Sequence, residues 1–319
     1  LILLSGCAQV TSLNLQKHQF GRIPTKIIWL QVAGLSPEHL AMLKFSYPSS
    51  SQSTAFEKSL CTGNTWEYNL FDIRPSASSG FMSQITGKKN IKNSCDDYDR
   101  KPIWKYISTK GYKVGVFEGQ SSKDESLLKA NTCSEAKDYL DEVIVWKMEK
   151  PATNDKTFHV NTERKFIAGE EYFDKSCSSG DCFTSFSRNV EKSFSLFNKN
   201  TNNYLYLVRN FKYSALLQKN KMKEAGEELA QINEVLNYFQ KYSKKRNDTL
   251  VLLTTASALE LDFPKGGKEG DRYTQKGRYL KAKNSKLISS VFAYGARAEN
   301  FCGIFDQSEI LGRIFSGTK

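Results

Sequence analysis

Few residues of this sequence could perform chemistry by themselves. A hydroxyl-rich segment, residues 47–54, offers Ser53 as a nucleophile, with Ser49, Ser50, Ser51 and Thr54 beside it. A serine hydroxyl is a poor nucleophile unless a base or a metal ion activates it. Of the three histidines, His39 directly follows Glu38, but this pair is better explained as residues of a helix's first turn that face water. The hydroxyls of residues 47–54 are better explained as capping the helix that follows than as catalytic groups.

The cysteines indicate disulfide bonds. Apart from Cys7 the chain has an even set: Cys61, Cys95, Cys133, Cys177, Cys182 and Cys302. Such a set fits three disulfides in an oxidising compartment, and Cys177 and Cys182 flank a tight glycine-containing loop that makes them the best candidate pair. Six cysteines allow 15 connectivities, so Cys95–Cys133 is only one option. A zinc site is the alternative, but no CxxC spacing is present and histidines are scarce, so we expect no metal.

The first seven residues resemble the end of a bacterial lipoprotein signal peptide. Leu4-Ser5-Gly6-Cys7 is similar to a lipobox, which implies removal of residues 1–6 and lipid attachment to Cys7. Residues 7–22 would then be the lipidated cysteine and a tether, and Ala8 after the cysteine favours the outer membrane, facing the periplasm. An ordinary apolar segment with a chance cysteine is the alternative. No later stretch approaches the ~18 apolar residues that span a bilayer.

The composition fits a folded, exported protein. The 319 residues are 39% hydrophobic and carry a net charge of +12. A basic surface suits an anionic neighbour such as phospholipid, an acidic polysaccharide or nucleic acid, although an exported location argues against nucleic acid. A mildly basic surface without a specific partner explains the charge equally well.

Residues 249–260 (TLVLLTTASALE) predict a buried strand, and the residues before them predict a helix. Helix, short loop and buried strand form the αβ unit of a parallel sheet, whose ligands bind beyond the carboxyl ends of the strands. That place holds Thr255, Ala256, Ser257 and Ala258, which neither bind a metal firmly nor transfer a proton at neutral pH. The helix has its apolar residues at helical spacing: Met222, Ala225, Leu229, Ile232, Leu236 and Phe239.

Periodicity and turn signals predict the remaining elements. We expect strands at 25–33, 112–117, 143–146, 204–208 and 287–294, and helices after Pro37 and at 103–108, 163–173, 186–197 and 308–315. A short helical pattern ends at 61–63, and 74–97 and 264–286 read as loops. We expect a single domain over 23–319, with an insertion or cap at about 150–200.

The order of these elements resembles the alkaline phosphatase superfamily of phosphatases, sulfatases, phosphodiesterases and phosphoethanolamine transferases. The matching segments are the strand through residues 29–35, Tyr47-Pro48 with the serines and Thr62-Gly63, the turn and strand at 110–115, the strand at 248–260 and the terminal segment 290–315. The resemblance implies an α/β fold with a mostly parallel central sheet flanked by helices. It also makes Ser53, nine residues before Thr62, the counterpart of the nucleophile.

The metal ligands of that family do not match. The family holds two zinc-class ions with carboxylates and imidazoles, which activate the nucleophile and neutralise the transferring group. Ala33 stands where the first strand would end in aspartate, and Ala256 and Ser257 stand where Asp-His would follow the late strand. After 204–208, where another Asp and His are expected, the sequence has Arg209-Asn210-Phe211-Lys212.

Two functions follow from this pattern. The first is a lipid-anchored, catalytically inactive member of the fold that acts as an envelope binding or scaffold protein, without a cofactor. Its cleft, fringed by Lys265, Lys268, Arg272 and Lys276, would take an anionic glycan or a partner protein. The alternative is a metal-independent phospho- or sulfo-ester hydrolase or transferase that uses Ser53.

Overall fold

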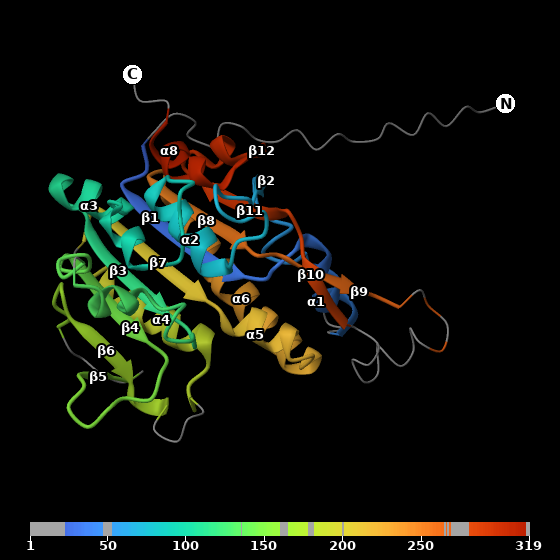
Figure 1. Ribbon diagram of the computed structural model, residues 1–319, viewed down its shortest axis with the longest axis horizontal. Helices are drawn as coiled ribbons and strands as arrows, with labels where there is room; N and C mark the ends of the chain where they lie inside the picture. The colour runs from blue at the N-terminus through green and yellow to red at the C-terminus, as the bar shows by residue number, and fades with distance from the viewer. Residues whose placement is uncertain are drawn as a thin grey trace.

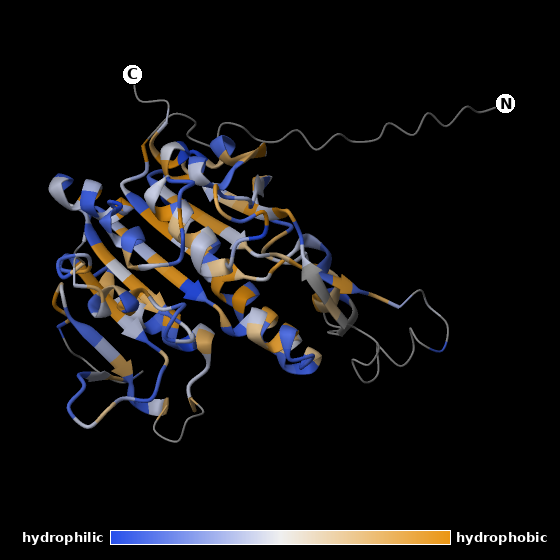
Figure 2. Cartoon of the chain, in the orientation of Figure 1, coloured by the Kyte–Doolittle hydropathy of each residue, from blue (hydrophilic) through white to orange (hydrophobic). Residues whose placement is uncertain are grey.

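A computed structural model describes residues 23–46, 53–134, 136–159, 165–177, 182–199, 201–264, 266, 268 and 281–316. Its centre is a sheet with helices on both faces (Figure 1). The hydropathy colouring shows the apolar residues concentrated in the central strands and in the helix sides that face them (Figure 2). Within the described ranges, none of the helices combines the length and apolar character that crossing a membrane demands.

Ten strands form the central sheet, and all but one run parallel. Their order across the sheet is β12 (Gly303–Asp306), β2 (Cys61–Trp66), β11 (Ile288–Gly295), β8 (Thr249–Ala256), β1 (Lys26–Ala33), β7 (Tyr204–Asn210), β3 (Lys113–Glu118), β4 (Val143–Lys147), β6 (Glu171–Asp174) and β5 (Thr157–Phe158). Strand β11 is antiparallel to both of its neighbours. A separate pair, β9 (Leu259–Asp262) and β10 (Lys281–Ser285), continues from the end of β8.

Helices cover both faces because the central strands are apolar on both sides. Ile28 and Leu30 of β1 face one core, whereas Ile27 and Trp29 face the other. The first core is closed by α1 (Leu40–Ser46), α4 (Phe186–Phe197), α5 (Lys212–Gln218) and α6 (Met222–Ser243). The second is closed by α2 (Ala77–Thr86), α3 (Ile103–Ile107) and α8 (Ile310–Phe315).

The mostly parallel sheet flanked by helices is confirmed, as are the strands at β1, β3, β4, β7, β8 and β11. The helices predicted at α1, α3, α4, α6 and α8 are also confirmed within a few residues. Within the region expected to be an insertion, β6 pairs with β4, β5 pairs with β6, and α4 packs on the first core.

Five expectations about local structure are wrong. Residues 281–285, which were expected to belong to a loop, form strand β10 and pair with β9. Residues 74–97 contain α2 rather than only loop, and Cys61 opens strand β2 rather than closing a helix. The described part of 163–173 leads into strand β6. His39 does not face water but is fully buried, because Nε2 lies 2.9 Å from the carbonyl oxygen of Leu259 and Nδ1 2.9 Å from the hydroxyl of Tyr213.

The six cysteines form three disulfides, which are Cys61–Cys302, Cys95–Cys133 and Cys177–Cys182. The first links β2 to the residue before β12 and so closes one edge of the sheet. The last is the pair expected from its glycine-containing loop.

Candidate functional site

The carboxyl ends of β1, β7 and β8 lie side by side. Strand β1 pairs with β7 on one side and β8 on the other, so that Val32 is level with Asn210 and Thr255, and Ala33 with Ala256. Three of the positions where the sequence resemblance leads us to expect metal ligands are therefore neighbours in space. This edge of the sheet is also where an open α/β fold binds its ligands.

Apolar side chains fill this place. Ala33, Phe81, Phe211 and Ala256 form a buried cluster of their own, and Ala77 packs against it. The rings of Phe81 and Phe211 meet edge to face with their centroids 5.5 Å apart. Methyl groups and phenyl rings offer no lone pairs to a metal ion, so these residues do not fit the two-ion centre that the fold family implies.

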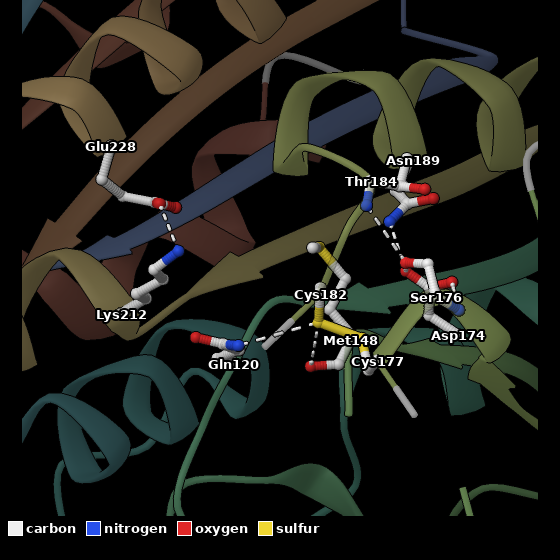
Figure 3. Close-up of a disulfide and its surroundings, with 10 residues drawn as sticks. All are labelled: Gln120, Met148, Asp174, Ser176, Cys177, Cys182, Thr184, Asn189, Lys212 and Glu228. Carbon is white, nitrogen blue, oxygen red and sulfur yellow. Dashed lines mark hydrogen bonds and ion pairs between the residues drawn. A yellow bond between two sulfur atoms is a disulfide. The ribbon is translucent and has the colours of Figure 1, made fainter. Parts of the chain in front are cut away.

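Elsewhere in the described part of the chain, the single group with metal-ligating spacing is Asp174 with Cys177 and Cys182. The two sulfur atoms are joined as a disulfide, and thiolates rather than disulfides bind metals. The carboxylate of Asp174 accepts hydrogen bonds from Ser176 and from Asn189 Nδ2, the latter at 2.6 Å (Figure 3). This group is therefore explained as part of the local structure.

Helix α2 brings its first turn to the apolar cluster. The hydroxyl of Ser76 caps the helix by accepting a hydrogen bond from the Ser79 amide, and the helix ends at Thr86-Gly87 with Gly87 in the left-handed conformation. In the sequence, the candidate nucleophile Ser53 lies nine residues before the Thr62-Gly63 pair. Thr86-Gly87 is a second such pair, and the residue nine positions before Thr86 is Ala77. Ala77 has no nucleophilic atom.

Ser53 lies elsewhere. It is exposed, and Thr62 and Gly63 belong to the middle of strand β2 rather than to a loop after a nucleophile. The turn after Ser53 packs on the long helix, where the Ala55 amide donates to Asn233 Oδ1 and Gln240 Nε2 donates to the Ala55 carbonyl. Neither contact brings a base to Ser53.

The end of β7 carries a buried ion pair where the family would place an aspartate and a histidine. Arg209 Nη1 donates to Glu118 Oε1 at 2.6 Å, and Glu118 also accepts hydrogen bonds from Ser126 Oγ and the Leu127 amide. The guanidinium carbon of Arg209 lies 4.9 Å from the ring centroid of Phe211. The Arg209 charge is thus neutralised inside the protein, next to the apolar cluster.

A protonatable carboxyl lies just beyond the end of β8, and the sequence analysis did not identify it. Glu67 is buried, and its Oε1 accepts a hydrogen bond of 3.0 Å from the Ala258 amide. Burial raises the pKa of Glu67 to about 8, so the group is largely protonated at neutral pH. Glu67 directly follows β2, a strand that the sequence pattern did not predict, so its place beside β8 was not predictable.

An open pocket of about 620 Å³ lies beside the apolar cluster. Its walls are the loop after β3, helix α5 and the start of α6, with Phe211 shared between cluster and pocket. Lys212, Lys219 and Lys221 line it together with the carboxylates Glu125, Glu224, Glu227 and Glu228. Lys212 is paired with Glu228 at 3.2 Å (Figure 3). Glu228 also accepts a hydrogen bond from Asn210 Nδ2.

The disulfide Cys177–Cys182 stands next to this pocket. Gln120, which lines the pocket, points its Nε2 at the sulfur of Cys182 from 3.7 Å (Figure 3). The same sulfur lies 3.8 Å from the carbonyl oxygen of Met148 at the end of β4. The cross-link thus fixes the segment that supports the β3 loop.

Several predicted site residues lie outside the described residues. These are Cys7, Lys265, Arg272 and Lys276. Of the four basic residues expected at the cleft, Lys268 is described, and it is exposed.

The molecule has an alkaline-phosphatase-like fold. It is similar to the alkaline phosphatase of the Antarctic bacterium TAB5, with a TM-score of 0.67 and 16% identity over 93% of this chain and 99% of that chain. For the Thermus thermophilus alkaline phosphatase the TM-score is 0.73, with 11% identity over 100% of this chain and 96% of that chain.

The lipoteichoic acid synthase LtaP from Listeria monocytogenes gives a TM-score of 0.54 and 12% identity over 94% of this chain and 74% of that chain. No protein-family model and no curated protein matches the sequence. These structural neighbours belong to the alkaline phosphatase and sulfatase-like superfamily, and at such low identity the likeness establishes the fold alone.

Proposed function

We propose that this chain is a lipid-anchored, catalytically inactive protein with an alkaline-phosphatase-like fold that acts as an envelope binding or scaffold protein. The observation that carries the proposal is the apolar cluster of Ala33, Phe81, Phe211 and Ala256 at the carboxyl ends of the central strands. Hydrolysis of phosphate esters by two metal ions needs ligands at this place to hold them. In this protein the ends of the central strands carry the methyl groups and phenyl rings of the apolar cluster instead.

The nucleophile position supports the same conclusion. Ala77 stands at the first turn of α2, against the cluster, where an attacking hydroxyl would be needed. Arg209, at the end of β7, is paired with Glu118 inside the protein. The nucleophile and metal-ligand positions are thus occupied by residues that pack or pair within the fold.

The ligand that we propose is an anionic group, such as that of an acidic glycan, bound in the pocket beside the cluster. Lys219 and Lys221 line the pocket at the turn between α5 and α6, and Phe211 and Leu216 give it an apolar wall. The pocket also holds four carboxylates, and two of them, Glu228 and Glu227, are paired with Lys212 and Lys223. An anion would therefore bind through direct contact with the ammonium groups of Lys219 and Lys221 rather than through a net positive charge of the pocket. The location that we propose is the periplasmic side of the outer membrane, through lipid attached to Cys7.

Metal content of the purified protein tests the loss of catalysis. After exposure to zinc, manganese and calcium followed by dialysis, we expect elemental analysis to find near-zero metal per chain. We also expect no turnover of phosphate or sulfate esters, with or without these ions. Two tightly held ions per chain together with ester hydrolysis would overturn the proposal, and loss of metal-independent turnover in Ser53→Ala would instead establish the alternative enzyme.

A second experiment tests the pocket. Binding of a soluble anionic polysaccharide should weaken at least about tenfold in the double variant Lys219→Gln/Lys221→Gln, because both ammonium groups are removed from the pocket. The control is Lys241→Gln/Lys244→Gln, because these two lysines are exposed at the other end of α6 and do not line the pocket. An equal loss in the variant and the control would show that net charge alone, and not the pocket, binds the polysaccharide.

A further inference from the structure

The carboxyl-terminal end of β2 carries a group of exposed apolar side chains that the proposed binding site does not use. We define the β2 patch as Trp66, Tyr68, Leu70, Phe71, Ile73 and Leu287. Trp66, Tyr68, Ile73 and Leu287 surround a shallow pocket of about 350 Å³, and the other two belong to the same loop. Exposed apolar groups gathered in this way mark an interaction surface, whereas single exposed ones need no explanation.

The loop of the β2 patch is held in a fixed shape. Asn69 is buried, and its Oδ1 accepts hydrogen bonds of 2.7 Å from the amides of Phe71 and Asp72. Asn69 Nδ2 donates to the Ile91 carbonyl, and the Leu70 amide donates to the Lys89 carbonyl. The disulfide Cys61–Cys302 secures the strand on which the loop stands. These hydrogen bonds and the disulfide therefore hold the loop in a conformation in which its apolar side chains are exposed.

The aliphatic side chains of the loop are more exposed than its aromatic ones. Trp66, Tyr68 and Phe71 are 40%, 42% and 53% exposed, whereas Leu70 and Ile73 reach 68% and 74%. Amphipathic Trp and Tyr rings prefer the head-group level of a membrane, and aliphatic groups prefer the acyl region below it. The difference in exposure between the two residue types therefore matches the depth profile of a lipid surface.

Basic side chains flank the β2 patch. The ammonium groups of Lys89 and Lys92 lie 4.7 Å and 5.6 Å from the ring centroids of Tyr68 and Phe71. Arg74 and Lys88 are exposed nearby. The carboxylates of Asp306 and Asp96 are each paired with one of these lysines. Asp72, which is exposed in the loop itself, adds a third carboxylate. The four basic side chains still outnumber the three carboxylates, and on a chain of net charge +12 this excess complements anionic head groups.

We propose that the β2 patch docks on the surface of an anionic phospholipid membrane. Leu70, Phe71 and Ile73 enter the outermost acyl region, while Trp66, Tyr68 and the flanking lysines stay among the head groups. A second copy of the chain fits less well, because a self-complementary contact would bring the basic flanks together. A glycan fits less well because Leu70 and Ile73, the most exposed residues, have no flat ring to stack on a sugar. The docking does not depend on lipid at Cys7.

The test uses the full chain with Cys7→Ser, so that no acyl chain contributes. Co-sedimentation is measured with phosphatidylcholine vesicles that contain about one-third phosphatidylglycerol. We expect Phe71→Ser/Ile73→Ser to weaken the partition coefficient at least about tenfold, because two inserting side chains are lost. The matched control, Ile167→Ser/Phe183→Ser, removes apolar side chains that are 57% and 96% exposed outside the patch, and should change binding less than about twofold.

Charge is tested separately with Lys88→Gln/Lys92→Gln, which should weaken binding to the anionic vesicles but not to pure phosphatidylcholine vesicles. Equal binding by the patch and control variants would overturn the proposal, as would absence of binding by the Cys7→Ser chain. Concentration-dependent dimerisation abolished by Phe71→Ser/Ile73→Ser would assign the surface to a second copy. Polysaccharide binding abolished by the same change, without vesicle binding, would assign it to a glycan. The polysaccharide titration of Lys219→Gln/Lys221→Gln reports independently on the pocket.

Discussion

Buried polar residues around the carboxyl ends of the strands link neighbouring elements through hydrogen bonds. His39 is the clearest case, since its ring links the helical turn after β1 to β9 through Leu259 and to α5 through Tyr213. Burial lowers the pKa of His39 to about 4, because the charged imidazolium would lose its hydration. The stability of the protein therefore depends on keeping this ring neutral.

We predict that His39 weakens the fold as the pH falls from about 6.5 to about 4. In this window the unfolded chain takes up a proton at His39 and the folded chain does not, so the free energy of unfolding decreases. At pH 5 the loss amounts to on the order of 2 kcal/mol. The free energy of unfolding is measured by urea denaturation at pH 7 and at pH 5, for wild type and for His39→Gln. We expect the decrease from pH 7 to pH 5 to be smaller in His39→Gln.

Wild type must be compared with His39→Gln because Glu67 has the opposite effect on the pH dependence of stability. The folded chain holds a proton at Glu67 up to a pKa of about 8, so this group stabilises the fold as the pH falls below that value. If His39→Gln kept the wild-type pH dependence, the histidine would not be the source of the acid sensitivity.

Helix α2 packs so closely on the end of β8 that a side chain at Gly80 would be strained. A Cβ atom at this position would lie 2.8 Å from the Ala256 Cβ and 3.1 Å from Gln307 Oε1. Gly80→Ala should therefore lower the free energy of unfolding by about 1–3 kcal/mol, measured by urea denaturation. Gly312→Ala in α8 is the matched control, since nothing lies within 4 Å of its added Cβ, and it should be neutral or stabilising by up to about 1 kcal/mol.

At the scale of the elements, the disulfides secure the sheet unequally. Cys61–Cys302 spans a sequence separation of 241 residues, and Cys177–Cys182 one of 5. In the chain-entropy model, the longer loop corresponds to about 5 kcal/mol and the shorter one to about 2 kcal/mol. We predict that Cys61→Ser/Cys302→Ser lowers the urea midpoint more than Cys177→Ser/Cys182→Ser does. Equal shifts would mean that native contacts, rather than loop closure, determine the effect.

The sequence predicted the elements whose own pattern is strong. Strands β1, β7 and β8 are continuous apolar runs, and α6 repeats its apolar residues at helical spacing. Helix α2 was missed because its serines and Gly80 are weak helix formers, and its stability comes from eight buried residues of ten. Strand β2 was missed because Gly63 reads as a turn. In the structure, a Cβ there would collide with the backbone of Phe301 and Gly303, so glycine permits β12 to approach.

The candidate site was predictable only in part. The positions of Ala33, Ala256 and Asn210 followed from the strand ends, and the structure brings them together. The positions of Ala77 and Phe81 were not predictable, because the sequence of α2 resembles that of a loop. The candidate nucleophile was therefore placed at Ser53. The roles of Arg209 and Glu67 depend on partners far away in the sequence, Glu118 and Ala258, which periodicity does not reveal.

At the scale of the whole molecule, the centre of the sheet has a consequence for how the chain folds. Strand β1 begins at Lys26, yet its hydrogen-bonding partners begin at Tyr204 and Thr249. Its apolar residues therefore emerge during synthesis long before either neighbour exists. Sheets built from such distant segments fold slowly and expose strand edges in the meantime. The chain can complete its core only after most of it has been made, so a newly made molecule remains open to chaperones, proteases and export machinery until its last third is available.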